Sequence, residues 1–226
     1  DVYKRQSSYY YNPSSPYGSG SYGGGGTVAP VVIWEYEVED GNATITKYNG
    51  TASAVVIPST LDGYTVTKIG NYAFYNNKSI RSVAMANTIT EIGDSVFGGC
   101  SNLSGINLPP NIVTIGALAF TDCSSLTEIY IPKTLSNSGW AFYGSGIVTA
   151  EFEKGMTVIP EGVFEYAGNL KNVTIPDTVI TIGNSAFGHC TSLETVSIPN
   201  SVTEIEINAF YSCNTCLLYT SDAADD

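Results

Sequence analysis

Phenylalanine recurs through this chain at a nearly constant interval, and that interval limits the possible folds more than any other feature. Each of these residues follows a small apolar residue, and an isoleucine stands five positions before six of them. Self-similarity at a fixed period indicates a repeat protein in which every repeat forms one structural unit. The recurring residues, separated by 22 or 23 positions, are Phe74, Phe97, Phe120, Phe142, Phe164, Phe187 and Phe210.

Each repeat also contains a short strand pattern. In the third repeat, for example, Ile129 and Ile131 alternate with the polar or amphipathic residues Glu128 and Tyr130, as expected for a half-buried strand. One coil of this length buries too little apolar surface to offset the entropy of ordering it, so neighbouring coils must share a core. The period predicts a leucine-rich repeat solenoid, with a parallel β-helix as the alternative. Proline lacks an N–H group and ends four of the strands, at Pro109, Pro132, Pro176 and Pro199.

The repeat motif resembles that of a known family. Residues 103–109, Leu-Ser-Gly-Ile-Asn-Leu-Pro, lead into an Ile-Gly-Ala-Leu-Ala-Phe segment that ends at Cys123, and residues 170–190 repeat the pattern closely. The chain resembles the BspA-like (Treponema pallidum type) leucine-rich repeat family over about residues 45–215. This resemblance implies a β-rich solenoid, a leucine-rich repeat array of about seven 22–23-residue coils, and an extracellular or cell-surface location. Asn137–Trp140 in the fourth repeat and Pro160 in the fifth depart from the motif, which predicts local irregularity within the same fold.

The segments around the repeats predict the domain organisation. Residues 1–6 and Cys216–Ser221 can be encoded by opposite strands of one DNA sequence, so we expect residues 1–6 and 216–226 to be adapter-like scars rather than native sequence. Residues 7–30 are rich in Ser, Tyr, Gly and Pro and predict a linker. Two alternating segments around Asp40-Gly41-Asn42 predict an N-terminal capping β-hairpin over residues 31–54. The solenoid then covers residues 55–215, and we expect it to be truncated at its C-terminus.

Composition argues against several classes of function. Nine basic residues stand against 21 acidic ones, giving a net charge of −12, which disfavours nucleic-acid binding. The longest apolar runs are far shorter than the roughly 18 to 20 residues that cross a bilayer, so we expect no membrane span. The single histidine, His189, is adjacent to Cys190 in a turn, where neighbouring side chains should point in different directions and cannot act as base and nucleophile. We therefore predict a protein that is not an enzyme and needs no cofactor.

Four cysteines occupy the same position in their repeats, three residues after the phenylalanine. A column of this kind does not converge on one point as a tetrahedral zinc site requires, so we expect no metal site. We predict buried free thiols, while disulfides between adjacent coils, Cys100 with Cys123 and Cys190 with Cys213, remain the alternative.

Outward-facing positions of the central strands supply the candidate binding face. Carboxylates gather there around Tyr130, and an aromatic side chain beside carboxylates suits a basic or glycan partner. A solvated sheet face is the plainer interpretation. Trp140 either bulges outward beside this patch or fills the core. The candidate residues are Asn107, Glu128, Tyr130, Trp140, Glu151, Glu153 and Thr174.

These features favour a non-enzymatic protein- or glycan-binding module of a bacterial secreted or cell-surface protein. Its partner would be a host or bacterial surface protein or glycan. The family resemblance implies adhesion, whereas the residues themselves indicate only a rigid, weakly charged face. The alternative is a structural spacer or targeting arm of a larger enzyme whose catalytic domain lies outside this sequence.

Overall fold

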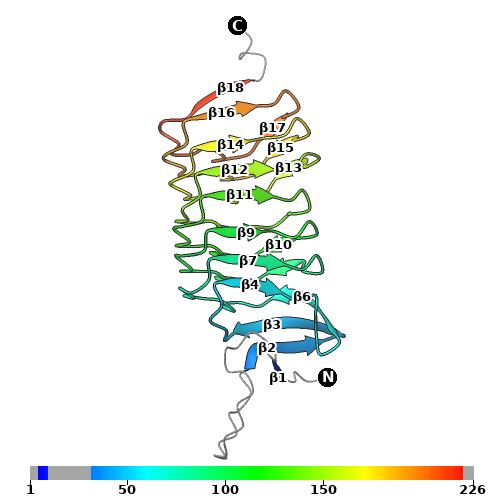
Figure 1. Ribbon diagram of the computed structural model, residues 1–226. Helices are drawn as coiled ribbons and strands as arrows, with labels where there is room; N and C mark the ends of the chain where they lie inside the picture. The colour runs from blue at the N-terminus through cyan, green and yellow to red at the C-terminus, as the bar shows by residue number, and fades with distance from the viewer. Residues whose placement is uncertain (1–4, 10–31, 221–226) are drawn as a thin grey trace, which may run out of the picture.

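The computed structural model describes residues 5–9 and 32–220, and it shows an elongated stack of coils (Figure 1). Every regular element of the described residues is a β-strand. The repeat phenylalanines lie in single file inside the stack, with ring centroids of adjacent coils 5.0–6.1 Å apart and ring planes within 25° of parallel. The predicted β-rich leucine-rich repeat solenoid is confirmed.

One side of the solenoid is built from the strands that the alternating pattern predicts. Their apolar residues point inward and their polar residues outward, as in β11, where Ile129 and Ile131 are buried. The strands are parallel and form two separate sheets, because β9 and β11 do not pair. The first sheet contains β4 (Ala54–Ile57), β7 (Ser82–Met85) and β9 (Gly105–Asn107), and the second contains β11 (Glu128–Ile131), β12 (Thr149–Phe152), β14 (Asn172–Thr174), β16 (Thr195–Ile198) and β18 (Leu217–Thr220).

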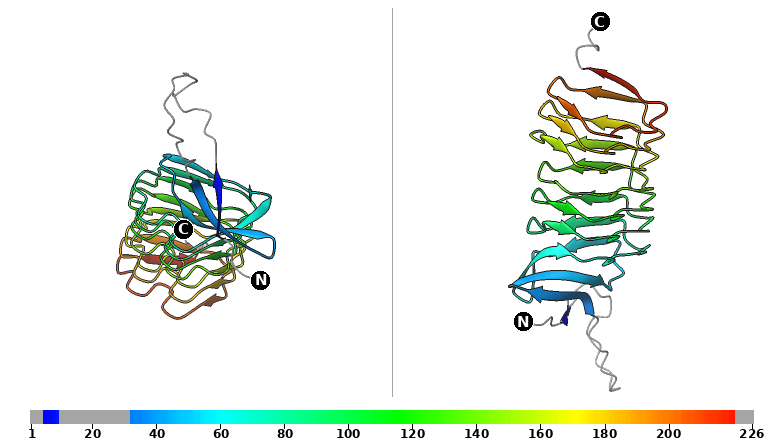
Figure 2. Two further views of the ribbon diagram at one scale, coloured as in Figure 1. Left: turned by 90° about the horizontal axis from the view of Figure 1, so that it is seen from below. Right: turned by 180° about the vertical axis from the view of Figure 1, so that it is seen from behind.

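A second set of very short strands stacks on another side of the coils (Figure 2). The fourth repeat interrupts this stack, because Asn137 replaces the usual isoleucine and makes only an isolated bridge to Thr114. The irregularity that the sequence predicted at this repeat is therefore local, and the coils continue beyond it. The strands are β8 (Glu91–Ile92) and β10 (Thr114–Ile115) before the interruption, and β13 (Val158–Ile159), β15 (Thr181–Ile182) and β17 (Glu204–Ile205) after it.

An antiparallel hairpin covers the first coil. It consists of β2 (Val32–Glu39) and β3 (Asn42–Tyr48), and its turn places Asp40 and Gly41 at positive φ. The rings of Trp34 and Tyr48 lie 6.1 and 5.1 Å from that of Phe74, so they shield the first ring of the phenylalanine column. β3 pairs with β6 (Tyr64–Ile69), which also pairs with β5 (Thr60–Leu61).

The two outermost strands lie near the ends of the chain, in segments that the sequence predicts to be adapter-like or part of a linker. β1 (Arg5–Tyr9) pairs with β2, and β18 pairs with β16. Both overlap the predicted adapter-like ends, whose origin stays a prediction from the sequence. Residues 1–4 and 221–226 of those ends, and residues 10–31, which contain most of the predicted linker, lie outside the described residues.

The cysteine column joins successive coils through hydrogen bonds. Cys100 Sγ donates to the carbonyl oxygen of Phe74 at 3.1 Å, and Cys123 Sγ donates to that of Phe97 at 3.1 Å. Burial raises the pKa of the Cys100 thiol to about 11, so the sulfur keeps the proton that it donates. All cysteines of the described residues are free thiols in this structure, including both pairs for which the sequence left a disulfide open.

Candidate functional site

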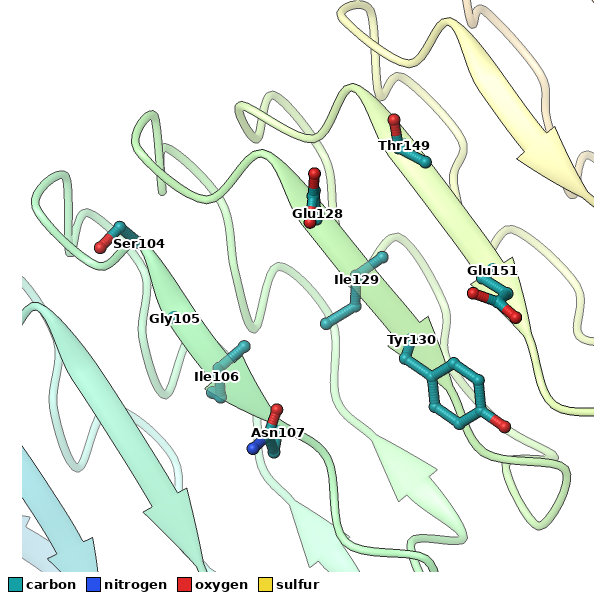
Figure 3. Close-up of a pocket in the computed structure, with 9 residues that line it drawn as sticks. All are labelled: Ser104, Gly105, Ile106, Asn107, Glu128, Ile129, Tyr130, Thr149 and Glu151. Atoms are coloured by element: carbon teal, nitrogen blue, oxygen red, sulfur yellow. The ribbon is translucent and has the colours of Figure 1, made fainter.

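A groove of about 410 Å³ lies on the strand face between β9 and β11 (Figure 3). Asn107 on β9, Glu128 and Tyr130 on β11, and Glu151 on β12 line it. These four residues belong to the binding face predicted from the sequence. The structure therefore brings the centre of that face together around a depression.

The groove coincides with a break in the hydrogen bonding between coils. At the coil before it, the N–H groups of Ser104 and Gly105 donate to the carbonyl oxygen of Arg81 at 2.9 and 3.1 Å. At the coil after it, Val148 and Thr149 donate to Thr127 in the same way. Within the described residues no such backbone bonds join the strand of β9 to that of β11. The sheet is thus open where the candidate side chains gather.

Strand register sets the arrangement of the outward side chains. Tyr130 lies opposite Glu151 on β12, which in turn lies opposite Thr174 on β14. The Tyr130 side chain is 48% exposed, whereas its neighbour Ile129 is buried beneath the face. Because parallel strands repeat every ~4.8 Å, these three side chains form a compact row across the edge of the groove.

Negative charge dominates the groove. Among the described residues, neither Glu128 nor Glu151 forms an ion pair, and no basic side chain lines the depression. Partial desolvation, followed by the charges of Glu153 and Glu151, raises the pKa of the Tyr130 phenol. The hydroxyl therefore stays protonated at neutral pH and can both donate and accept a hydrogen bond.

Glu153, which the sequence placed in the same patch, has a partner of its own. Its carboxylate accepts a hydrogen bond from the Lys133 backbone N–H at 3.0 Å and lies 3.4 Å from Lys133 Nζ. The backbone hydrogen bond and the Lys133 charge lower the pKa of Glu153, although slight burial opposes them. Glu153 thus ties the turn after β11 to the end of β12 and does not line the groove.

We expect Glu153→Gln to destabilise the protein slightly at neutral pH, by less than about 0.5 kcal/mol, since the pair is solvent-accessible. The folded pKa lies below the unfolded one, so the carboxylate stabilises the fold above its ordinary pKa and loses this effect as the pH falls through the lowered value. Urea unfolding at neutral pH and near pH 3 tests this expectation. A difference between wild type and variant that grows with acidity would contradict it.

Trp140 lies apart from the groove. Its side chain is 51% exposed, so it bulges outward rather than filling the core. It lines a separate depression with Glu161 and Glu165. The sequence therefore predicted exposure as one of two options for Trp140, but grouped it with residues that lie on another surface.

Two polar side chains of the groove, those of Ser104 and Thr149, were not among the candidate residues predicted from the sequence. Thr149 stands opposite Glu128, and its outward position follows from the strand alternation. Ser104 precedes β9 at a position where the alternation carries no signal.

A family model described as the BspA type leucine rich repeat region matches this chain in six copies, over residues 48–167 and 157–222. The chain belongs to the BspA-type leucine-rich repeat family. Proteins of this family are repeat scaffolds, and leucine-rich repeats generally serve as protein-interaction modules. The resemblance predicted from the Ile-Gly and Ala-Phe columns is confirmed.

Solved structures of BspA-type and related leucine-rich repeat proteins resemble the chain. A leucine-rich cell surface protein from Faecalibacterium prausnitzii is 33% identical with a TM-score of 0.65, and the match covers 83% of this chain and 53% of that protein. The T. pallidum leucine-rich repeat protein is 27% identical with a TM-score of 0.72, covering 84% and 90%. A Bacteroides ovatus leucine-rich repeat protein is 26% identical with a TM-score of 0.66, covering 86% and 53%. The chain thus spans about half the length of the Faecalibacterium and Bacteroides proteins.

No curated protein sequence matches the chain significantly. Membership of the BspA-type family therefore rests on the repeat model and on the solved structures.

The single histidine lies outside the groove and packs against an aromatic ring. His189 stacks on Tyr166 with ring centroids 4.2 Å apart and planes 6° from parallel. In the described parts of the chain, no three His, Cys, Asp or Glu side chains gather in a way that would hold a metal ion. The same residues contain no helix of the length and hydrophobicity that a bilayer crossing requires.

Proposed function

We propose that this BspA-type solenoid is a non-enzymatic binding module of a bacterial secreted or cell-surface protein, and that its β9–β11 groove binds a cationic segment of a partner protein. The observation that carries the proposal is a pair of carboxylates, Glu128 and Glu151, beside Tyr130 at the break in the sheet, neither of which has an ion-pair partner among the described residues. The description of the F. prausnitzii neighbour as a cell surface protein supports this location.

The chemistry of the groove suits arginine and lysine side chains. A guanidinium group forms two parallel hydrogen bonds with a carboxylate, and it also stacks on aromatic rings. Glu128, Glu151 and Tyr130 offer both kinds of contact within two paired strands. The Asn107 amide adds a donor and an acceptor on the opposite wall.

The strands also hold these side chains on a rigid scaffold. Coils that stack on both sides and a continuous phenylalanine column leave little freedom in the backbone of β11 and β12. Binding to a pre-organised surface avoids part of the ordering entropy. Because the charged groups of the groove are both negative, they also steer a positively charged partner toward it and raise its association rate.

We expect the double variant Glu128→Gln/Glu151→Gln to bind cationic peptides at least about tenfold more weakly than wild type. Surface plasmon resonance against a set of Lys- and Arg-rich peptides, measured at low and physiological salt, tests this expectation. Tyr130→Ala should also weaken binding, but it should leave the salt dependence unchanged.

A matched control removes the same net charge at residues that do not line the groove. Asp122→Asn/Glu204→Gln changes two exposed acidic residues that form no ion pair in the described structure. Equal weakening by both double variants would show general charge attraction and overturn the groove site. If no peptide binds, but the protein binds glycans on an array and the groove variants reduce that binding, the partner of the groove is a glycan rather than a protein. A solenoid that acts only as a spacer predicts no specific binding in either assay.

A further inference from the structure

The fourth repeat forms a second depression, of about 280 Å³, where its sequence departs from the family motif. Trp140, Asn137, Glu161 and Glu165 contribute the polar and aromatic part of its wall, and no basic residue of the described ranges lines it. None of these residues lines the β9–β11 groove. The depression is therefore a separate feature of the surface.

The structure holds the Trp140 indole in an outward position. Trp140 adopts a φ of 54°, and the residues at the same repeat position, Tyr72 and Leu118, have φ values of 62° and 57°. The coil geometry thus fixes this backbone conformation whatever the side chain. In the next coil, Gly162 lies beside the indole, and a Cβ at that position would be 3.6 Å from Trp140 Cδ1, an ordinary contact distance.

A carboxylate fixes the orientation of the ring. Trp140 Nε1–H donates a hydrogen bond to Glu165, which is partly buried. Glu161 lies on the same wall, and neither acidic residue forms an ion pair within the described residues. The depression therefore combines a half-exposed indole with two negative charges that have no cationic partner.

This combination matches one class of ligand. The indole is the best aromatic partner for a cation, and quaternary ammonium groups are recognised through such contacts. A primary ammonium group brings three N–H donors and a strong hydration shell, whereas Glu165 already accepts the indole N–H. Methyl groups on nitrogen need no acceptor and pack against the indole. The depression is also slightly smaller than the ~300–1,000 Å³ of drug-sized sites, which fits a head group.

We propose that Trp140, Glu161 and Glu165 form a binding site for a trimethylammonium head group of the choline type. The indole contacts the methyl groups, and the two carboxylates compensate the charge. The site is independent of the β9–β11 groove and of the cationic protein segment proposed there.

Choline and its neutral isostere, 3,3-dimethylbutan-1-ol, test the proposal on the full chain. The protein contains two tryptophans, Trp140 and the buried Trp34, so the indole N–H signals in a two-dimensional NMR titration report on the site and on an internal control. We expect choline to shift the Trp140 signal, to leave the Trp34 signal in place, and to bind at least about tenfold more tightly than the isostere.

Variants separate the contributions of ring and charge, with choline binding followed by calorimetry. Trp140→Ala should abolish choline binding, Trp140→Phe should retain a weaker site, and Glu161→Gln should weaken binding several-fold without disturbing the Glu165 contact. An unchanged Trp34 signal in each variant shows that the fold is intact. The groove variant Glu128→Gln/Glu151→Gln should bind choline like wild type, so failure of one site is distinguishable from failure of the other.

Three results would overturn the proposal. Equal affinity for choline and the neutral isostere would show that charge plays no part. Tighter binding of methylammonium than of choline would indicate a site for primary ammonium groups. A Trp140 signal that choline leaves unmoved would show that the ligand does not contact the indole.

Discussion

Replacing Phe120 by alanine is expected to lower the free energy of unfolding by about 3–5 kcal/mol. Phe120 is fully buried, and its ring stacks between those of Phe97 and Phe142 at centroid distances of 5.4 and 5.1 Å. The substitution removes the transfer free energy of the ring and leaves a cavity at the middle of the column. Stability in a solenoid depends on nearest-neighbour interfaces, so a cavity here weakens two of them.

Urea unfolding followed by circular dichroism measures this loss. Phe120→Leu keeps most of the volume and should cost less, about 1.5 kcal/mol or below. Tyr130→Ala is the matched aromatic control on the exposed face, and we expect it to change stability by no more than about 0.5 kcal/mol. A loss below about 1 kcal/mol for Phe120→Ala would mean that the phenylalanine column does not support the stack. Unfolding in two steps would instead show that the cavity uncouples the two halves.

The phenylalanine column could be predicted from the sequence because identical residues at one spacing occupy identical environments. Phe97 and Phe120 are 23 residues apart, and the structure stacks them with planes 12° from parallel. The strand face followed from the alternation around Ile129 in the same way. In a repeat protein the motif that specifies the fold is thus present in many coils, so one repeat that departs from it does not change the predicted fold.

The groove could not be predicted from the sequence because the phenylalanines have the same spacing where the sheet opens as where its strands pair. The interval between Phe97 and Phe120 equals that between Phe74 and Phe97, yet β9 pairs with β7 and not with β11. Periodicity reports the buried column, whereas pairing at the surface depends on backbone positions that differ by small amounts between coils. The site arises from such a difference.

The surroundings of Glu153 and Trp140 could not be predicted because each depends on a contact between neighbouring repeats. The alternation places Glu153 on the same face as Glu151, two positions along the strand direction, but its long side chain reaches back to the Lys133 backbone. The indole N–H of Trp140 reaches Glu165, one coil further along the chain. Neither contact has a signature in a single repeat, so the sequence left Trp140 open and grouped Glu153 with the binding face.

Gly116→Ala is expected to lower the free energy of unfolding by about 1–3 kcal/mol, although it adds only one methyl group. A Cβ at this position would lie 2.5 Å from the carbonyl carbon of Gly93 and 2.6 Å from the Asp94 nitrogen, both backbone atoms of the preceding coil. The Gly116 N–H also donates to the Ile92 carbonyl oxygen at 2.7 Å. The added methyl group must therefore separate the coils and lengthen this hydrogen bond.

Gly105→Ala provides the matched control. A Cβ there would meet only the Ser82 Cβ, at 3.8 Å, an ordinary contact. Alanine also loses less conformational entropy than glycine on folding, so we expect Gly105→Ala to be neutral or stabilising by up to about 1 kcal/mol. Thermal and urea unfolding of both variants distinguish a specific clash between coils from a general effect of added side chains.

The result at Gly116 also bears on the irregular fourth repeat. Ser138 occupies the position that Gly93 and Gly116 hold in their coils, and its buried hydroxyl has no hydrogen-bond partner in the described structure. In the stack of short strands, pairing at that coil is reduced to the single bridge of Asn137. If Gly116→Ala is strongly destabilising, the side chain of Ser138 at this position contributes to the irregularity of the fourth repeat. Full stability of Gly116→Ala would instead assign the irregularity to Asn137 alone.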